Sequence, residues 1–360
     1  MNSTERVMTA LHHREPDRVP VYESFWPEFI AKWRREKSLG PDIDINEYYH
    51  LDLPSYGKVG CDQTPWPSSQ RDLERGEGFR LVRSGWGAII KRLDTMSLDE
   101  MVEPGIKQRS DLAKLPPFEP ASLDARYAAV ADWVAKVAGK GFCFFAKTGG
   151  PFSRTWPYRG LELFLMDLVE DPAFAGELLS RQTDLLIATL GEMLRRAPFP
   201  QTVVWIADDC AYRNAPLFSP RVYQSLIQPH LARLCDFIHA TGRLAAFESE
   251  GNTAPLLEMV LDAGVDVLTN LEPRAGMDVV ALKRQFGQRA SFIGTMCNTI
   301  VLPRGTVAEV RAETLRTLRA GIGGGVVFGS AHTIGPDVPV ANYEAFLDTL
   351  REFGTYPLLL

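Results

Sequence analysis

The chain lacks the features that mark a secreted, membrane-spanning or nucleic-acid-binding protein. Its cysteines, at positions 61, 143, 210, 235 and 297, form no CxxC pair and no disulfide-like rhythm, which predicts a reduced, cytoplasmic protein. Residues 1–18 contain no apolar core of the signal-peptide type, and no apolar run approaches membrane-spanning length. The net charge is −6, and Lys and Arg are spread along the chain. We therefore expect neither a nucleic acid nor a membrane as a partner.

What the sequence does contain is enough apolar material for one large core. Of its 360 residues, 45% are hydrophobic, and we expect a single domain over residues 1–360. Residues 1–120 are irregular and rich in Trp, Pro and Gly, with a short first helix that has Ser3 as its N-cap and a hairpin-like stretch at 79–93. Residues 121–360 are regular.

In this regular part short apolar strands alternate with helices, which predicts parallel strands buried on both faces. With one further early strand the count approaches eight. This favours an α/β fold of the distorted (β/α)₈ TIM-barrel type, with the irregular N-terminal part over the barrel mouth. A doubly wound sheet is the alternative, but no GxGxxG follows the first strand, and "GIGGGVV" (321–327) precedes a strand and predicts a helix C-cap and loop. The expected strands are 19–25, 141–149, 202–209, 243–248, 266–270, 291–295 and 325–330.

Polar residues follow most of these strands. Barrel enzymes carry their catalytic groups at the C-terminal strand ends, so these residues are candidates for one shared site. They are Lys147, Asp208, Asp209, Glu248, Glu250, Asn270, Glu272, Cys297 and His332.

The segment "FESEGN" (247–252) places two carboxylates on the same side of one strand end. If Glu248 and Glu250 point inward, their repulsion requires a proton or a cation. A divalent metal with His332 as third ligand would form a Zn²⁺ site with an open position, although two oxygen donors also suit other divalent metals. In the alternative interpretation one glutamate faces solvent, the other pairs with an Arg, and His332 is a hydrogen-bonded structural group. Asp208 and Asp209 could likewise cap backbone N–H groups.

Several segments, in the right order, resemble the uroporphyrinogen decarboxylase superfamily. The resemblance covers nearly the whole chain and implies a distorted (β/α)₈ barrel. The segments are "RVMTALHHREPDRVPV", "FSPRVYQSLIQPHLARLCDFIHATG", "FESEGNTAPLLEMVLDAGVDVLTNLEPRAGMD" and "GVVFGSAHTIGPDVPVANYEAF".

Two departures bear on the chemistry that this resemblance implies. True decarboxylases carry an N-terminal Met-Arg-Gln-Ala-Gly-Arg-Tyr segment whose arginines bind substrate carboxylates, but here the stretch is "VYESFWPEFIAKWRRE". The chain looks closer to the zinc-dependent, corrinoid-linked methyltransferases. These commonly carry His-x-Cys-Gly-Asn and a late Cys, and the matching positions are Glu248, Glu250 and His332. The ligand types differ, although all three residues can bind a metal.

The resemblance implies a methyl transfer in which the metal acts as a Lewis acid on the substrate heteroatom. Because carboxylates are harder ligands than thiolates, we expect an oxygen-linked methyl donor such as a methoxylated aromatic. Asp208 and Asp209 would orient the substrate or act as general acid. Tyr22, Trp26, Lys147, Asn270 and Glu272 would bind the substrate, and Cys297 would be a fourth metal ligand.

The expected acceptor is a corrinoid on a separate partner protein, and an exposed barrel flank could serve a homodimer. Two other functions stay open at this point. One is a metal-free decarboxylase of uroporphyrinogen or a smaller acid, and the other is a non-catalytic ligand binder.

Overall fold

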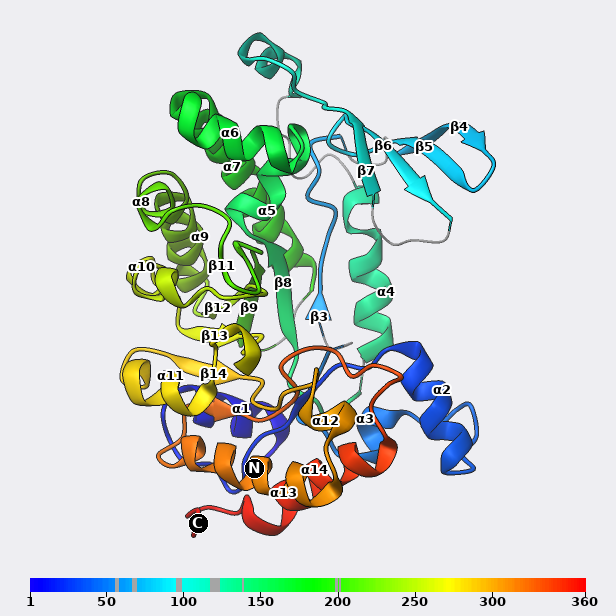
Figure 1. Cartoon of the computed structure of the whole chain (residues 1–360), viewed down its shortest axis with the longest axis vertical. Coiled ribbons are helices and arrows are strands. Elements are labelled where there is room, and N and C mark those ends of the chain that lie inside the picture. Colours follow the sequence, from blue (N-terminus) through cyan, green and yellow to red (C-terminus); the bar gives the residue numbers. More distant parts are fainter. Residues whose placement is uncertain are drawn as a thin grey trace.

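A computed structural model describes residues 1–55, 58–66, 70–94, 99–116, 124–137, 139–197, 200 and 202–360. The predicted boundary near residue 120 lies outside the described residues. Figure 1 shows a sheet of strands surrounded by helices, with a separate antiparallel sheet projecting at the upper right. No helix in the described ranges is long and apolar enough to cross a membrane.

The central sheet has seven strands, and every neighbouring pair in it is parallel. Its strands are short and apolar and are buried along most of their length, which is the pattern of a parallel sheet covered on both faces. In spatial order they are β15 (Val326–Val327), β14 (Ser291–Ile293), β13 (Val267–Thr269), β12 (Leu244–Glu248), β9 (Val203–Ala207), β8 (Phe145–Gly149) and β3 (Lys58–Val59).

Two short N-terminal strands connect the ends of this sheet. β1 (Tyr22–Glu23) pairs in parallel with β2 (Leu53–Pro54), which precedes β3 along the chain. On its other side, the Tyr22 amide donates to the carbonyl of Phe328 at 2.7 Å, just beyond β15, and the Phe328 amide donates to the Pro20 carbonyl at 2.9 Å. The strands therefore follow one another around a ring, as the predicted barrel requires.

Helices cover the outside of the ring (Figure 1). The longest is α7 (Pro172–Arg196), whose buried face packs against the core. The remaining helices are α1 (Ser3–Leu11), α2 (Pro27–Glu36), α3 (Ile45–Tyr48), α4 (Ala128–Val137), α5 (Pro151–Thr155), α6 (Leu161–Glu170), α8 (Pro220–Val222), α9 (Gln228–Ala240), α10 (Leu257–Asp262), α11 (Val279–Phe286), α12 (Val301–Arg304), α13 (Val307–Leu318) and α14 (Val340–Phe353).

Side chains cap the N-terminal ends of α1 and α8, with one correction to the prediction. Ser219 caps α8, because its side chain accepts a hydrogen bond from the Val222 amide. The N-cap of α1, however, is Asn2 and not Ser3, because Asn2 and Glu5 form the reciprocal hydrogen bonds of a capping box.

The N-terminal third contains more regular structure than the sequence predicts. The expected hairpin at 79–93 is present as β5 (Phe79–Arg83) and β6 (Ile89–Leu93), and it is flanked by β4 (Arg71–Gly76) and β7 (Asp99–Glu103) in an antiparallel sheet. β4 and β7 are mostly exposed and polar, so their hydrophobic pattern is too weak to mark them as strands. A two-stranded ribbon of β10 (Ala211–Tyr212) and β11 (Ala215–Pro216) follows β9.

Large side chains fill the interior of the ring. The Trp205 ring lies 4.8 Å from the Phe145 ring and 5.4 Å from the Tyr22 ring, measured between centroids. These residues belong to a cluster with the buried residues Val203, Ala246, Val267, Ile293 and Val327, which come from β9, β12, β13, β14 and β15. The interior is thus packed, and cavities open at its C-terminal end.

Candidate active site

Two adjoining cavities open among the loops that follow the C-terminal strand ends. The outer cavity has a volume of about 390 Å³ and the inner cavity about 60 Å³. Asn270 and His332 line both of them, so these residues form the wall between the two. The outer cavity is also lined by Tyr212, Arg213, Glu250, Glu272, Arg274 and Thr299, and the inner one by Tyr22, Ser55, Phe145, Lys147, Trp205 and Glu248.

Glu248 and Glu250 both point toward this region but enter different cavities. Glu248, the last residue of β12, accepts a hydrogen bond of 2.6 Å from Lys147 Nζ, which comes from β8. Both side chains are partly buried, so the ion pair sits where the water dielectric is reduced. The positive charge of Lys147 therefore neutralises one of the two carboxylates that the sequence places together.

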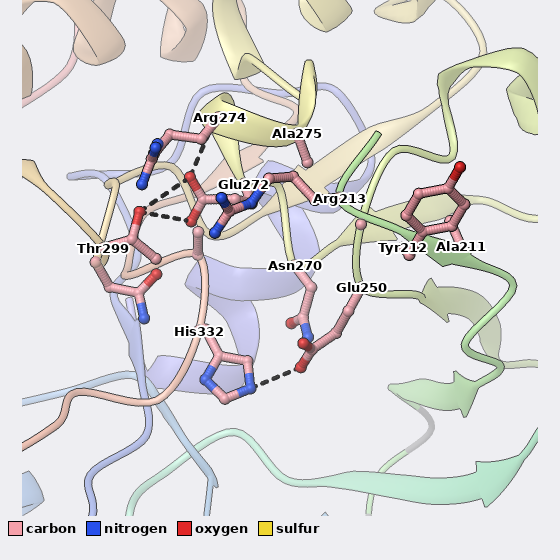
Figure 2. Close-up of a pocket in the computed structure, with 13 residues that line it drawn as sticks. Ala211, Tyr212, Arg213, Glu250, Asn270, Glu272, Arg274, Ala275, Thr299 and His332 are labelled. Carbon is pink, nitrogen blue, oxygen red and sulfur yellow. Dashed lines mark hydrogen bonds and ion pairs between the residues drawn. The ribbon is translucent and has the colours of Figure 1, made fainter. Parts of the chain in front are cut away.

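The second carboxylate pairs with a histidine from the far end of the chain. His332 Nε2 lies 2.7 Å from Glu250 Oε1, as the dashed line in Figure 2 shows. This hydrogen bond raises the pKa of His332 above its ordinary value and lowers that of Glu250. Glu248 and Asp209 also favour the imidazolium electrostatically. Both shifts favour an imidazolium beside a carboxylate, with His332 on the wall of both cavities and Glu250 on that of the outer one.

Asp208 lies behind the site and lines neither cavity. It is fully buried at the end of β9, and burial raises its pKa to about 7. The Ser153 amide donates to Oδ1 at 2.6 Å, while Oδ2 has no hydrogen-bond partner among the described residues. Gly150 makes room for the side chain, since a Cβ there would lie 2.1 Å from the Asp208 Cβ.

Asp209 supports the main chain that carries Glu250. Its Oδ1 accepts a hydrogen bond of 3.0 Å from the Glu250 amide, and its own amide donates to Ser153 Oγ at 2.7 Å. Burial raises the pKa of Asp209. Like Asp208 it lines neither cavity, so in this structure both aspartates position neighbouring groups instead of facing a ligand.

Cys297 and Glu272 form a third group on the outer rim. Cys297 Sγ lies 3.7 Å from Glu272 Oε1 and 3.3 Å from Thr299 Oγ1. The Glu272 carboxylate also accepts from the Arg274 amide at 3.0 Å and caps the turn Pro273–Ala275 (Figure 2). Glu272 lines the outer cavity as predicted, whereas Cys297 lies just behind it.

Asn270 has a backbone conformation that non-glycine residues seldom adopt. Its φ is 56°, in the left-handed region, and such strain concentrates at functional sites. The conformation places Asn270 between the two cavities, beside Glu250 and His332 in Figure 2.

Of the two aromatic residues predicted to bind the substrate, one lines a cavity and the other does not. Tyr22 lines the inner cavity, where burial raises its pKa. Trp26 is 50% exposed at the start of α2 and lines neither cavity. The structure thus brings every predicted substrate-binding residue except Trp26 to the cavities.

Sequence reasoning missed two arginines of the outer cavity. Arg213 lies in the turn between β10 and β11, and Arg274 follows Glu272. Neither guanidinium has a salt bridge or hydrogen bond within the described ranges. Their positions directly after strand ends were the available signal, but exposed arginines in loops are too common to stand out.

The four predicted metal ligands lie in one region, but each already binds another partner. Glu248 is bound to Lys147, Glu250 to His332, and Cys297 to Glu272. Across the part of the chain that the structure describes, no group of three or more His, Cys, Asp or Glu side chains is arranged to hold a metal ion. As arranged here, the donors do not fit a zinc site.

Comparison with known families settles the relationship of the chain. Residues 96–353 match the model described as "Uroporphyrinogen decarboxylase (URO-D)". The chain belongs to this family. A search of curated proteins found no match.

The fold of this family member agrees with a solved structure. A methyltransferase from Methanosarcina mazei is similar over 98% of this chain and 99% of its own, with a TM-score of 0.71 and 18% sequence identity. The D-psicose 3-epimerase of Clostridium cellulolyticum H10, solved with D-tagatose, matches 68% of this chain and 84% of its own at 14% identity, with a TM-score of 0.35. The first match shows a shared fold.

Proposed function

We propose that this protein transfers a methyl group from oxygen of a small substrate to an acceptor, with the His332–Glu250 pair as proton donor. Family membership and the full-length similarity to a methyltransferase support methyl transfer. The single observation that carries the proposal is the 2.7 Å contact between His332 and Glu250 on the wall shared by both cavities.

The proposed step needs a proton because the leaving oxygen takes the electrons of the broken C–O bond. A nucleophilic acceptor forms a new bond to the methyl carbon, and the oxygen becomes an alcohol or phenol once it is protonated. In the imidazolium form of His332 both ring nitrogens carry protons. Nε2 is bound to Glu250, so the Nδ1 proton is free to be donated, and solvent restores it afterwards.

Glu250 would stabilise the imidazolium and hold its orientation, the role of the carboxylate in other His–carboxylate pairs. Asp209 in turn positions Glu250 through its amide. Lys147 binds Glu248 nearby, so each of the two carboxylates after β12 has a cationic partner of its own.

The metal-dependent form of this function, with Zn²⁺ on Glu248, Glu250, His332 and Cys297, stays a prediction. Those donors already bind one another or Lys147. We therefore derive no step through a metal, and the Brønsted acid takes the place of the expected Lewis acid. A metal-to-protein ratio near one in protein purified without chelator would reverse this assignment.

The cavities favour a small substrate over a porphyrinogen. The outer cavity, at about 390 Å³, is at the small end of ligand sites. Three glutamates line the two cavities, and the cations facing them are Lys147, Arg213, Arg274 and the His332 imidazolium. These charges nearly balance, so the small volume of the cavity, and not its charge, argues against a porphyrinogen, and a neutral aryl methyl ether fits. A corrinoid on a partner protein is the acceptor that we propose.

The test is methylation of reduced cobalamin by an aryl methyl ether, followed by the visible spectrum of methylcobalamin. We expect turnover with wild-type protein in the presence of chelator, and losses of about 100-fold or more in His332→Gln and Glu250→Gln. His239→Gln is the matched control, because it breaks another exposed His–carboxylate pair, His239–Asp266 at 2.8 Å, away from both cavities. Release of carbon dioxide from a candidate acid without methyl transfer would favour the decarboxylase instead.

A further inference from the structure

A larger cavity lies beside the site and shares none of its lining residues. It has a volume of about 1090 Å³ and is lined by β6 and β7 of the antiparallel sheet on one side. On the other side are α5, the turn Trp156–Tyr158 and the start of α6. We call it the side cavity. Its volume is at the upper end of the range of small-molecule sites.

Arg154 differs from the other arginines of the side cavity in how its guanidinium is bound. No hydrogen bond or salt bridge reaches its guanidinium within the described residues. The other arginines of the lining are engaged: Arg92 binds Asp99 at 2.7 Å and Arg159 binds Asp167 at 2.6 Å. Asp62 and Asp208 act on this cation electrostatically, but its N–H groups make no hydrogen bond to either, so they are open to the carboxylate of a ligand.

The structure holds Arg154 in place against an aromatic ring. The Trp86 indole N–H donates to the Arg154 carbonyl at 3.0 Å, and the guanidinium carbon lies 5.9 Å from the centroid of the Trp86 ring. This contact fixes the position of the cation by a cation–π interaction while its N–H groups stay available.

The rest of the lining mixes apolar side chains with polar ones, which include Asp62, Asp99, Glu100 and Glu162. Leu163 is 40% exposed, and Val102 on the facing strand is 53% exposed. Large apolar side chains left partly in water around one cavity favour an apolar occupant. The apolar side chains of the lining include Trp86, Ile90, Met101, Trp156, Leu161 and Leu163.

The side cavity also touches the machinery of the first site. Ser153 lines it, and the same residue donates its amide to Asp208 and accepts from the Asp209 amide. Asp209 then binds the Glu250 amide. An occupant in contact with Ser153 would therefore be separated from Glu250 by a short series of hydrogen bonds.

We propose that the side cavity is a second ligand site that takes a flat, apolar monocarboxylate. The carboxylate binds the guanidinium of Arg154 through two parallel N–H···O bonds, and the apolar body lies against Trp86 and Trp156. This proposal does not depend on the proposed methyl transfer, and a measurement of ligand binding alone can test it.

Titration calorimetry of the full-length protein with 2-naphthoate and with the uncharged 2-naphthamide tests the site. The carboxylate should bind about tenfold or more tightly than the amide, since a charge-assisted pair is worth more than a neutral one. Arg154→Gln should abolish that difference. Arg92→Gln, which removes an arginine already paired with Asp99, should preserve it.

A second variant decides the matter if Arg154→Gln does not fold. Met101→Trp narrows the cavity from β7, where Met101 is partly buried, and should weaken both probes by about tenfold or more. Equal affinities of acid and amide for wild-type protein, an unchanged preference in Arg154→Gln, full affinity in Met101→Trp or no binding of either probe would overturn the proposal.

Discussion

At the scale of single residues, the site consists of charges that neutralise each other in pairs. Lys147 forms an ion pair with Glu248, and His332 forms one with Glu250. Each partner comes from a different strand or strand-end loop, so the ion pairs form only when the ring of strands is complete. The protonation states of these side chains therefore depend on the fold, and the pH dependence of activity should show this.

The proposed role of His332 predicts how the rate of methyl transfer declines at high pH. The pKa of His332 is raised above 6.5 mainly by its hydrogen bond to Glu250, and that of Glu250 is lowered below 4.5 mainly by His332. The imidazolium therefore persists above pH 6.5 and is lost as pH rises through its raised pKa, whereas the carboxylate is lost only as pH falls below its lowered one. Methyl-transfer rates should fall on the alkaline side with that raised pKa.

Glu250→Gln removes the main cause of the shift, so any residual activity should fall off at a lower pH than in the wild type. His239→Gln should leave the profile unchanged, because His239 and Asp266 lie away from the cavities. An alkaline limb at the same pH in Glu250→Gln and in the wild type would contradict the role of the pair.

Asp208 gives a second prediction, on stability. Its pKa is raised from 3.8 to about 7 mainly by burial, so the charged form is disfavoured in the folded state and stability declines as pH rises from about 4 through about 7. A shift of about three units corresponds to at most about 4 kcal/mol. Asp208→Asn should therefore unfold at higher urea concentration than wild type at pH 8, and the difference should shrink as the pH is lowered toward 4. A wild-type advantage at pH 8 would show that Asp208 is stabilised as the anion.

At the scale of elements, the strand ends and their loops decide where side chains point. β9 ends at Ala207, and the next two residues turn away from the cavities to hold the loop after β8 and the main chain after β12. The close approach between these loops depends on Gly150. Its φ is negative, so a glycine is needed here only because a side chain would collide with Asp208.

Gly150→Ala should consequently destabilise the protein by about 1–3 kcal/mol, the usual effect of overpacking, because its Cβ would lie 2.1 Å from the Asp208 Cβ. Gly141→Ala is the matched control, since a Cβ there meets nothing within 4 Å. Urea unfolding of both variants provides the measurement. Equal midpoints would mean that the loop after β8 shifts freely to accept the methyl group.

The periodic elements could be predicted from the sequence, and the pairings of the site could not. Seven strands and the long helices follow from alternation and capping residues, and the rule for strand ends brought Glu248, Glu250 and His332 to one region. The sequence does not show that Lys147 would reach Glu248, nor that Glu250 would take His332 as its partner. Those contacts depend on side-chain direction across several strands. The outer strands of the antiparallel sheet could not be predicted, because β4 and β7 carry few buried apolar residues.

At the scale of the whole molecule, the ring depends on its first strand. β1 is joined on one side to β2 and on the other to the segment after β15. Deleting residues 1–25 should leave both neighbours with unpaired edges and abolish cooperative unfolding in urea. Deleting Leu359 and Leu360, which are 86% and 42% exposed, should leave the transition unchanged. A truncated protein that still unfolds in one sharp transition would show that the ring closes without β1.

The junction between Tyr22 and Phe328 also sets an order of events during synthesis. The strand that carries Tyr22 is synthesised long before the segment that carries Phe328, so it must wait for that partner. During that interval the growing chain presents open strand edges, which neighbouring nascent chains can capture. Production of this protein should therefore benefit from slow expression or added chaperones far more than from a change of temperature once the chain has been released.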